Sequence, residues 1–383
     1  MLYLNRNQVG KKTLWTVEGI YALIALEFLY MATPFAAFFY SVYSPILNFT
    51  NRYPSLAWLN STFLPHVVQD TSSSLLNLRV PIGIVLFITG ILGFTIGAVQ
   101  IYYTKIFRKT AVLGGLYRFI RHPQYLFLMI WGLGLVLLWP RKIVLIFYVT
   151  MIFIYYRLAC LEEKECERKF GEEYKRYKNK TGMFFPANLV PKIKLTENPL
   201  LKRAGHLPVI IIYILTITLT VMLSWLAGSW SRNQLYAFYT PDAVYISITK
   251  INEQSGKDII EKVLADPQVQ KRLSQENNFK NTKYINYILP ADMYMLEIPM
   301  NSPRNGLYVH YLSPVHSAEK IKIIFTQAEI RGHREVHGRE ILEHVAGRIP
   351  VMEVYIDLVQ KNIVEIKDPP LHVALKDIVM PVY

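Results

Sequence analysis

The chain has 383 residues, 52% of them hydrophobic, with a mean hydropathy of +0.21 and a formal net charge of +14. This apolar content is above that of an ordinary soluble domain. Residues 1–230 carry 24 lysines and arginines against 10 acidic residues, whereas residues 231–383 carry 18 of each. Excess positive charge between apolar runs is typical of the cytoplasmic loops of membrane proteins. We therefore expect a membrane protein that contacts the lipid bilayer and has no nucleic-acid partner.

Five apolar segments follow one another, at roughly 17–43, 80–103, 125–139, 143–159 and 207–227. The first, second and fifth are long enough to cross about 30 Å of hydrocarbon at about 1.5 Å per residue. The third and fourth are short, and only Pro140, Arg141 and Lys142 separate them. They predict a short helical hairpin that barely spans the bilayer or re-enters it. The predicted fold is an α-helical integral membrane protein with about five transmembrane segments.

Lysine and arginine in the loops predict the orientation of these segments. Nineteen of them lie in residues 1–16, 104–122 and 160–206, whereas residues 44–79 and the hairpin tip hold four. By the positive-inside rule, the N-terminus and the richly basic loops are cytoplasmic. After five spans, the C-terminal domain is extracytoplasmic. The expected location is a plasma, bacterial inner or endoplasmic reticulum membrane.

Residues 231–383 predict an α+β domain outside the membrane, which leaves room for an extracytoplasmic partner. Its strand-like runs are AVYISITK, MYMLEIPM, GLYVHYL, IKIIFTQ and VMEVYIDL. The run GKDIIEKVLADPQVQKRLSQ has helical spacing, with a break at Pro267. The expected organisation is an N-terminal segment with an outer loop (1–78), a membrane core (79–206), a transmembrane helix (207–230) and this outer domain (231–383).

The stretch RGHREVHGREILEHV places His333, His337 and His344 at helical spacing. Zinc proteases need Glu directly after the first His of such a motif, and Arg334 stands there instead. Gly338 also weakens a helix. We therefore expect a surface or loop histidine cluster and no metal site.

A cluster of polar residues, Arg121-His122-Pro123-Gln124-Tyr125, opens the third apolar segment. Proline disfavours helical geometry in the residue before it and is well suited to the first turn of a helix. His122 is therefore expected at a helix start, with Tyr125 in the first turn. The free amides of that turn and the Arg121 guanidinium favour a bound anion such as a carboxylate.

Two adjacent acids, Glu162 and Glu163, follow the fourth apolar segment. Hydropathy predicts a helix C-terminus there, where the macrodipole disfavours negative charge, so the acids require a cation. Local pairing with Arg157, Lys164 or Arg168 is one solution. A ligand with an ammonium group, a pair of hydroxyls and a carboxylate would satisfy both motifs together. S-adenosylmethionine has all three.

Residues 79–186 resemble the isoprenylcysteine carboxyl methyltransferases and phospholipid N-methyltransferases. The likeness runs in order through GLYRFIRHPQYL, the short hairpin, EE, FGEEYKRYKNKT and FFP. It implies an S-adenosylmethionine-dependent enzyme that acts on a membrane-embedded lipid or prenylated acceptor. The cofactor-binding residues that it implies are Arg121, His122, Tyr125, Glu162 and Glu163. It also implies a lid that contains Gly171, Tyr174 and Tyr177.

Displacement at a sulfonium methyl needs positioning and desolvation more than acid–base help. Glu163 is the candidate catalytic base if the acceptor is an amine, and Arg157 is the candidate for steering an anionic acceptor. Phe127 stands where the family commonly has Gly, so we expect it to narrow the space near the cofactor or acceptor. Gly93 and Gly97 form a GxxxG pattern that indicates helix packing.

Two other functions remain open. Sterol reductases of the same membrane superfamily bind NADPH, and EEKECERKFG resembles their sequence through Cys166, Lys169, Phe170 and Gly171. Alternatively, the chain is a non-catalytic membrane anchor or sensor whose outer domain binds a partner.

Overall fold

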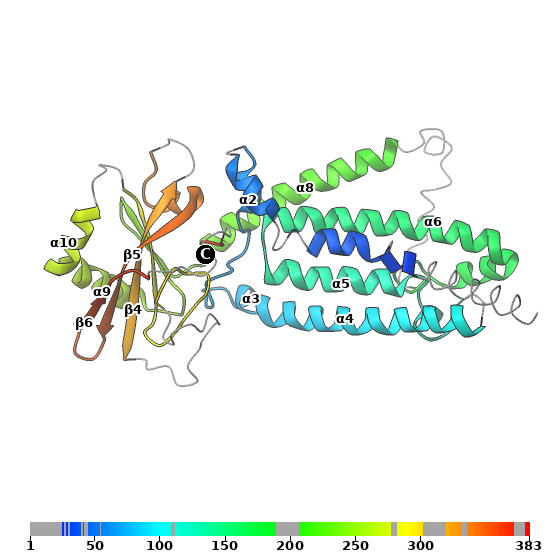
Figure 1. Cartoon of the computed structure of the whole chain (residues 1–383), viewed down its shortest axis with the longest axis horizontal. Coiled ribbons are helices and arrows are strands. Elements are labelled where there is room, and N and C mark those ends of the chain that lie inside the picture. Colours follow the sequence, from blue (N-terminus) through cyan, green and yellow to red (C-terminus); the bar gives the residue numbers. More distant parts are fainter. Residues whose placement is uncertain are drawn as a thin grey trace, which may run out of the picture. The chain divides into compact units, whose positions relative to one another are not determined.

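The computed structural model describes residues 25–26, 28–29, 31–39, 41, 45–53, 55–108, 112–188, 207–276, 282–301, 319–330, 335–370 and 380–383. The chain divides into two compact units (Figure 1). The first unit comprises Met1–Tyr43, Pro81–Leu137 and Val144–Thr220, and the second comprises Ser44–Val80, Leu138–Ile143 and Val221–Tyr383.

Helices dominate the chain before the sheet. They are α2 (Pro45–Arg52), η1 (Ala57–Asn60), α3 (Ser74–Asn77), α4 (Arg79–Tyr103), the π-helical turn η2 (Thr104–Arg108), η3 (Gly115–Arg118), α5 (Pro123–Leu138), α6 (Lys142–Lys180) and α8 (Leu207–Arg232). In the described residues, three helices are long and apolar enough to cross a membrane: Ser74–Tyr103, α6 and α8. With 16 residues, α5 is shorter, about 24 Å long.

These helices confirm four of the five predicted apolar segments as helical, including the hairpin formed by α5 and α6. The first segment, 17–43, lies only partly within the described residues, and those described between 25 and 41 are helical. The described structure thus supports a membrane protein with three candidate spans. A total of five spans stays a prediction.

The fourth predicted helix is longer than its apolar segment, because α6 keeps helical geometry without a break as far as Phe170. The expectation that Glu162 and Glu163 lie at a helix C-terminus is therefore wrong, and with it the argument from the macrodipole. The apolar run ends near Ala159, but the charged residues that follow it are good helix formers and extend the helix. Helical geometry is interrupted at Gly171, whose φ of 55° and ψ of −129° suit a residue without a side chain, and a second helical segment follows as far as Lys180.

Glycines of α4 allow α5 to approach closely. A Cβ atom built on Gly93 would lie 2.1 Å from the Phe127 ring, and one built on Gly90 would lie 2.5 Å from Trp131. Small residues let membrane helices pack with their backbones close together. The prediction that the GxxxG pattern serves helix packing is thus confirmed for Gly93. The Phe127 ring occupies the space that a side chain at position 93 would otherwise fill.

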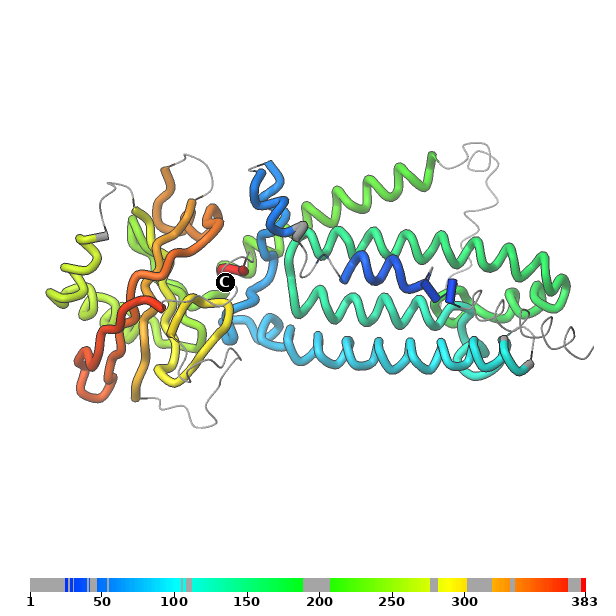
Figure 2. The backbone as a smooth tube through the Cα atoms, viewed as in Figure 1, coloured from blue at the N-terminus to red at the C-terminus, as the bar shows by residue number. Residues whose placement is uncertain are grey.

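The C-terminal part of the chain builds one six-stranded sheet with the order β1-β2-β3-β4-β5-β6. The strands are β1 (Ala237–Tyr239), β2 (Ala243–Ser247), β3 (Tyr284–Pro290), β4 (Lys320–Ile330), β5 (Val345–Asp357) and β6 (Asn362–Lys367). All neighbours are antiparallel except β2 and β3, whose crossover contains α9 (Glu253–Ala265) and α10 (Pro267–Glu276) (Figure 2). The short helix α11 (Arg339–His344) precedes β5.

Each face of the sheet has its own apolar core. On one face, Ile260, Val263 and Val269 of the two crossover helices pack against strand residues. The other face is covered largely by irregular segments, which include Val67 and Val68 of the second unit's N-terminal segment. The central strands of the sheet are therefore buried on both sides, whereas the edge strand β6 is largely exposed.

Three segments predicted on the same side of the membrane pack together within the second unit. The amide of Phe63 donates to the Pro140 carbonyl over 2.9 Å, which joins the loop after α2 to the hairpin tip. The amide of His66 donates to the Tyr383 carbonyl over 2.7 Å, and that of Gln69 donates to Ile248 over 3.0 Å. The loop of residues 61–70 therefore connects the hairpin tip to the sheet domain.

The structure confirms some of the elements predicted in residues 231–383 and contradicts others. The helix pair and its break at Pro267 are confirmed, and three of the predicted strand runs contain or overlap β2, β4 and β5. The run MYMLEIPM is buried but forms turns, so that strand prediction was wrong. GLYVHYL and His333 lie outside the described residues. His337 precedes α11, and His344 is its last residue.

Filling the space beside Gly93 should destabilise the helix pair. In Gly93→Ala the new methyl group meets the Phe127 ring, and we expect the variant to unfold more readily by about 1–3 kcal/mol, the usual cost of overpacking. Gly97→Ala is the matched control, because its Cβ would find Gln124 at an ordinary 3.5 Å. The thermal midpoint in detergent measures both. Phe127→Ala should partly restore Gly93→Ala, and equal effects of the two glycine substitutions would contradict this packing.

Candidate functional site

The Arg121-His122-Pro123 motif lies in an extended segment that leads into α5. Pro123 is the first residue of the helix, as predicted. The amide of Arg121 donates to the Gly182 carbonyl over 2.9 Å, and that of His122 donates to the Met183 carbonyl over 3.0 Å. Because a proline disfavours helical geometry before it, the extended backbone is free to pair with the segment that follows α6. The motif is thereby fixed between two helices.

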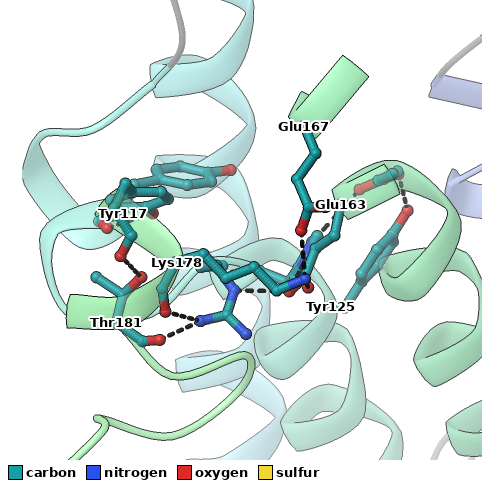
Figure 3. A network of polar contacts seen from close by, with 10 residues as sticks. Tyr117, Tyr125, Glu163, Glu167, Lys178 and Thr181 are labelled. Atoms are coloured by element: carbon teal, nitrogen blue, oxygen red, sulfur yellow. Dashed lines mark hydrogen bonds and ion pairs between the residues drawn. The ribbon is translucent and has the colours of Figure 1, made fainter. Parts of the chain in front are cut away.

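Glu163 is the centre of a buried ion network (Figure 3). Its carboxylate receives Arg121 Nε at 2.6 Å and Lys178 Nζ at 3.0 Å, and His122 Nε2 lies 3.5 Å away. Arg121 also donates from Nη1 to the carbonyls of Lys178 and Thr181. The side chains of Arg121 and Glu163 are only 9% and 4% exposed. A carboxylate taken out of water to this degree depends on such partners.

Glu162 has a different environment from its neighbour. Its side chain is 39% exposed, and its carboxylate accepts a hydrogen bond from the Tyr125 hydroxyl. His122 Nδ1 lies 3.3 Å from the other Glu162 oxygen. The His122 ring stacks on Tyr125 at 5.7 Å between centroids, and Tyr125 stacks on Tyr155 at 4.8 Å. A partly open carboxylate thus lies beside a row of aromatic rings.

The imidazole of His122 is buried between two acids. Neither ring nitrogen has hydrogen-bond geometry to any residue that the structure describes, although both lie near carboxylates. Burial by itself would lower the pKa of His122, but its direct contacts with the carboxylates of Glu162 and Glu163, and their negative charges, outweigh burial and raise that pKa above its usual value. The ring therefore holds its proton more tightly than a histidine in water does.

The segment after Gly171 folds back over this network. Tyr174 is buried, and the Tyr177 hydroxyl donates to the Tyr117 carbonyl over 2.6 Å. Lys178 bridges Glu163 and Glu167 (Figure 3). From the sequence, Lys178 is only one of the basic residues predicted in the cytoplasmic loops, and no pattern singles out Thr181. The signal that could have found them is the run FGEEYKRYKNKT, whose glycine permits the turn.

Five of the six predicted site residues come together: Arg121, His122, Tyr125, Glu162 and Glu163. Arg157 does not join them. It lies exposed in a groove between α6 and α8, two residues after Tyr155, whose buried ring faces Tyr125. A step of two residues turns about 200° around a helix, so Arg157 is on the opposite face of α6.

Comparison with known proteins relates the segment that contains the site to methyltransferases. Residues 78–173 match the sequence model of the family described as phospholipid methyltransferase. The family resemblance is confirmed over this segment. The protein-S-isoprenylcysteine O-methyltransferase of Saccharomyces cerevisiae is 39% identical over 74 residues, which cover 19% of this chain and 30% of the yeast enzyme. No solved structure gave a significant match. The methyltransferase-like segment therefore includes all six predicted site residues but neither α8 nor the sheet domain.

The two adjacent glutamates should contribute very differently to stability. Glu163→Gln leaves Arg121 and Lys178 without their buried counter-charge, and we expect a loss of about 3–5 kcal/mol, the usual cost of breaking a buried pair. Glu162→Gln removes charge from a partly exposed side chain, so its effect should be smaller. Thermal unfolding in detergent compares them. Equal destabilisation by both substitutions would contradict the proposed asymmetry.

Protonated His122 should stabilise the fold in a defined pH range. Because its folded-state pKa is raised above the usual value of about 6.5, this contribution is fully present below about pH 6.5. It is lost as pH rises through the higher folded-state pKa. His122→Asn should lack this part of the pH dependence. Thermal midpoints of wild type and variant, measured from below pH 6.5 upward through the folded-state pKa, test the prediction. If the midpoints of both proteins changed with pH in the same way, the prediction would be refuted.

Proposed function

We propose that the membrane core, residues 79–206, forms an S-adenosylmethionine-dependent methyltransferase that acts on a membrane-embedded lipid or prenylated acceptor. The observation that carries the proposal is the junction of the Arg121-His122 motif with Glu162 and Glu163 at the start of α5, within a methyltransferase-like segment. The matched relative is an isoprenylcysteine O-methyltransferase, which supports an acceptor of that class.

The residues present fit such a methyl donor. The partly exposed Glu162 carboxylate suits the ammonium and hydroxyl groups of S-adenosylmethionine. The buried Tyr125 ring, which stacks on His122 and on Tyr155, fixes that carboxylate through its hydroxyl. The buried His122 ring lies between the two acids, with Nδ1 3.3 Å from Glu162 and Nε2 3.5 Å from Glu163, and so holds Glu162 from its second oxygen. We propose that Glu162 contacts the donor and that Tyr125 and His122 hold its carboxylate in place.

Arg121 and Glu163 are better suited to positioning. The Arg121 guanidinium already donates to Glu163 and to two carbonyls, so its capacity for a ligand carboxylate is largely used. Glu163 is 4% exposed and has three cationic neighbours. We propose that this pair holds His122 and Glu162 in place. Glu162 then replaces Glu163 as the candidate base.

The donor, when bound, supplies a methyl group activated by a sulfonium. The protein's contribution is to orient the reactants and keep water away, which suits a reaction that needs little acid–base help. The segment after Gly171 covers the network and would exclude solvent. A carboxylate acceptor needs no base. An amine acceptor must lose a proton, and the partly exposed Glu162 can accept it.

The orientation predicted from the loop charges is part of this proposal, with the donor site at the cytoplasmic face. Its support is that the loop after α2, the hairpin tip and the C-terminal domain, all predicted on the outer side, belong to one compact unit. The NADPH-dependent reductase and the non-catalytic anchor or sensor have no comparable support, because both comparisons favour methyltransferases.

Ligand-induced stabilisation tests the donor site. S-adenosylhomocysteine at a hundredfold excess over its dissociation constant should stabilise the purified protein by about 2.7 kcal/mol. Glu162→Gln should lose this response. The matched control is Glu165→Gln, which removes an exposed acid of the same helix that pairs only at the surface with Arg168, and should keep it.

The other outcomes separate the alternatives. Stabilisation by NADPH alone would favour the reductase, and no response to either ligand would favour the anchor or sensor. If S-adenosylhomocysteine binds, transfer of a labelled methyl group to prenylated cysteine carboxylates or to lipid amines identifies the acceptor class.

A further inference from the structure

A groove lies between α6 and α8, with a volume of about 380 Å³. It is lined by Thr150, Phe153, Ile154, Arg157 and Leu158 of α6 and by Val209, Ile210 and Tyr213 of α8. Thr150 and Tyr213 join the helices through their hydroxyls, which are 2.9 Å apart. The rings of Phe153 and Tyr213 meet edge to face at 5.2 Å. The two apolar helices therefore contact each other directly at the groove, and the side chains that line it are mostly hydrophobic.

This groove is separate from the proposed donor site. Tyr155 is buried and stacks on Tyr125, which holds Glu162 on the inner face of α6. Arg157 and the groove occupy the opposite face of the helix. Moreover, α8 lies outside residues 78–173, the part that matches the methyltransferase family. The groove thus depends on a helix that the matched segment lacks.

A single cation stands in the groove wall. Arg157 is exposed, and within the described part of the chain no ion pair or hydrogen bond of its guanidinium is present. A guanidinium beside hydrocarbon is costly unless an anion or water reaches it. Lys164 is also exposed and lies seven residues further on, on the same face and about 10 Å along the helix. Arg157 and Lys164 therefore lie one after the other along α6, on the face that lines the apolar groove.

We propose that the groove binds an anionic phospholipid of the surrounding bilayer. Its phosphate contacts Arg157 and comes within reach of Lys164, while one acyl chain lies along Phe153, Ile154 and Ile210. Basic residues at the ends of membrane helices recognise anionic head groups in this way. The charge selects the head group, and the apolar wall accepts a chain. The lipid fastens α8 to α6 and is distinct from the methyl acceptor.

Lipid retention by the full-length protein tests the proposal without any assay of methyl transfer. The protein is reconstituted in membranes that contain phosphatidylglycerol and phosphatidylcholine, and the lipids kept after detergent extraction are counted by native mass spectrometry. Wild type should retain phosphatidylglycerol preferentially. In Arg157→Gln we expect retention to fall at least about fivefold, the effect of one basic residue near an anionic surface.

Two further variants separate a specific site from general attraction. Arg168→Gln removes the same charge further along the same face, from an exposed side chain that already pairs with Glu165 at 2.6 Å, and should retain the lipid. Ile210→Trp fills the groove without changing any charge and should lose it. Folding of each variant is checked by its elution volume and thermal midpoint.

Four results would overturn the proposal. Equal losses in Arg157→Gln and Arg168→Gln would indicate diffuse electrostatic attraction, and equal retention of both lipids in wild type would exclude head-group selection. If Ile210→Trp still retained the lipid, the groove would not be its binding site, and the Arg157 side chain would only extend to the membrane surface. Displacement of the lipid by a farnesylated cysteine carboxylate would make the groove part of the acceptor path, whether or not S-adenosylhomocysteine binds at Glu162.

Discussion

The methyltransferase-like segment depends on one buried ion pair, that between Arg121 and Glu163. These charges come from residues 42 positions apart in sequence and meet at 2.6 Å with almost no access to water. Their desolvation is offset only if both are fully partnered, and Lys178, His122 and two carbonyls complete the shell. Because the pair joins the start of α5, the middle of α6 and the segment after Gly171, losing one charge would disturb all three.

Neighbouring positions on a helix can serve different purposes, and Glu162 and Glu163 show how. They are separated by about 100° around α6, which is enough to bury one and leave the other 39% exposed. The inner acid fixes the framework, while the outer acid keeps capacity for a ligand. The Tyr125 hydroxyl and the His122 ring hold the outer carboxylate without closing it off. A rigid inner acid behind a partly open one is a suitable arrangement for positioning a small charged cofactor.

Features set by local chemistry could be predicted from the sequence, whereas those set by distant contacts could not. Pro123 determines a helix start through its own ring, so that boundary was predicted correctly. The pairing of Lys178 with Glu163 depends on the turn at Gly171, which hydropathy does not reveal. In the sheet domain, β3 was missed because its first six residues are all buried and show no alternation. Residues 293–300 have a strand-like pattern, but they pack as turns against the core.

The two faces of α6 explain why this helix carries both of the proposed sites. A membrane helix can bury charge only where other parts of the protein supply counter-charges, and the inner face meets this condition through the Arg121 motif. On the outer face, Arg157 has no such group among the described residues, and we propose that the bilayer supplies its counter-charge. α8 changes that balance, because it builds an apolar wall beside Arg157 and Tyr213 closes it with a hydroxyl contact to Thr150. A helix outside the methyltransferase-like segment thus makes the exposed Arg157 part of one side of a groove. It does so without touching the inner face, where Glu162 and Glu163 lie.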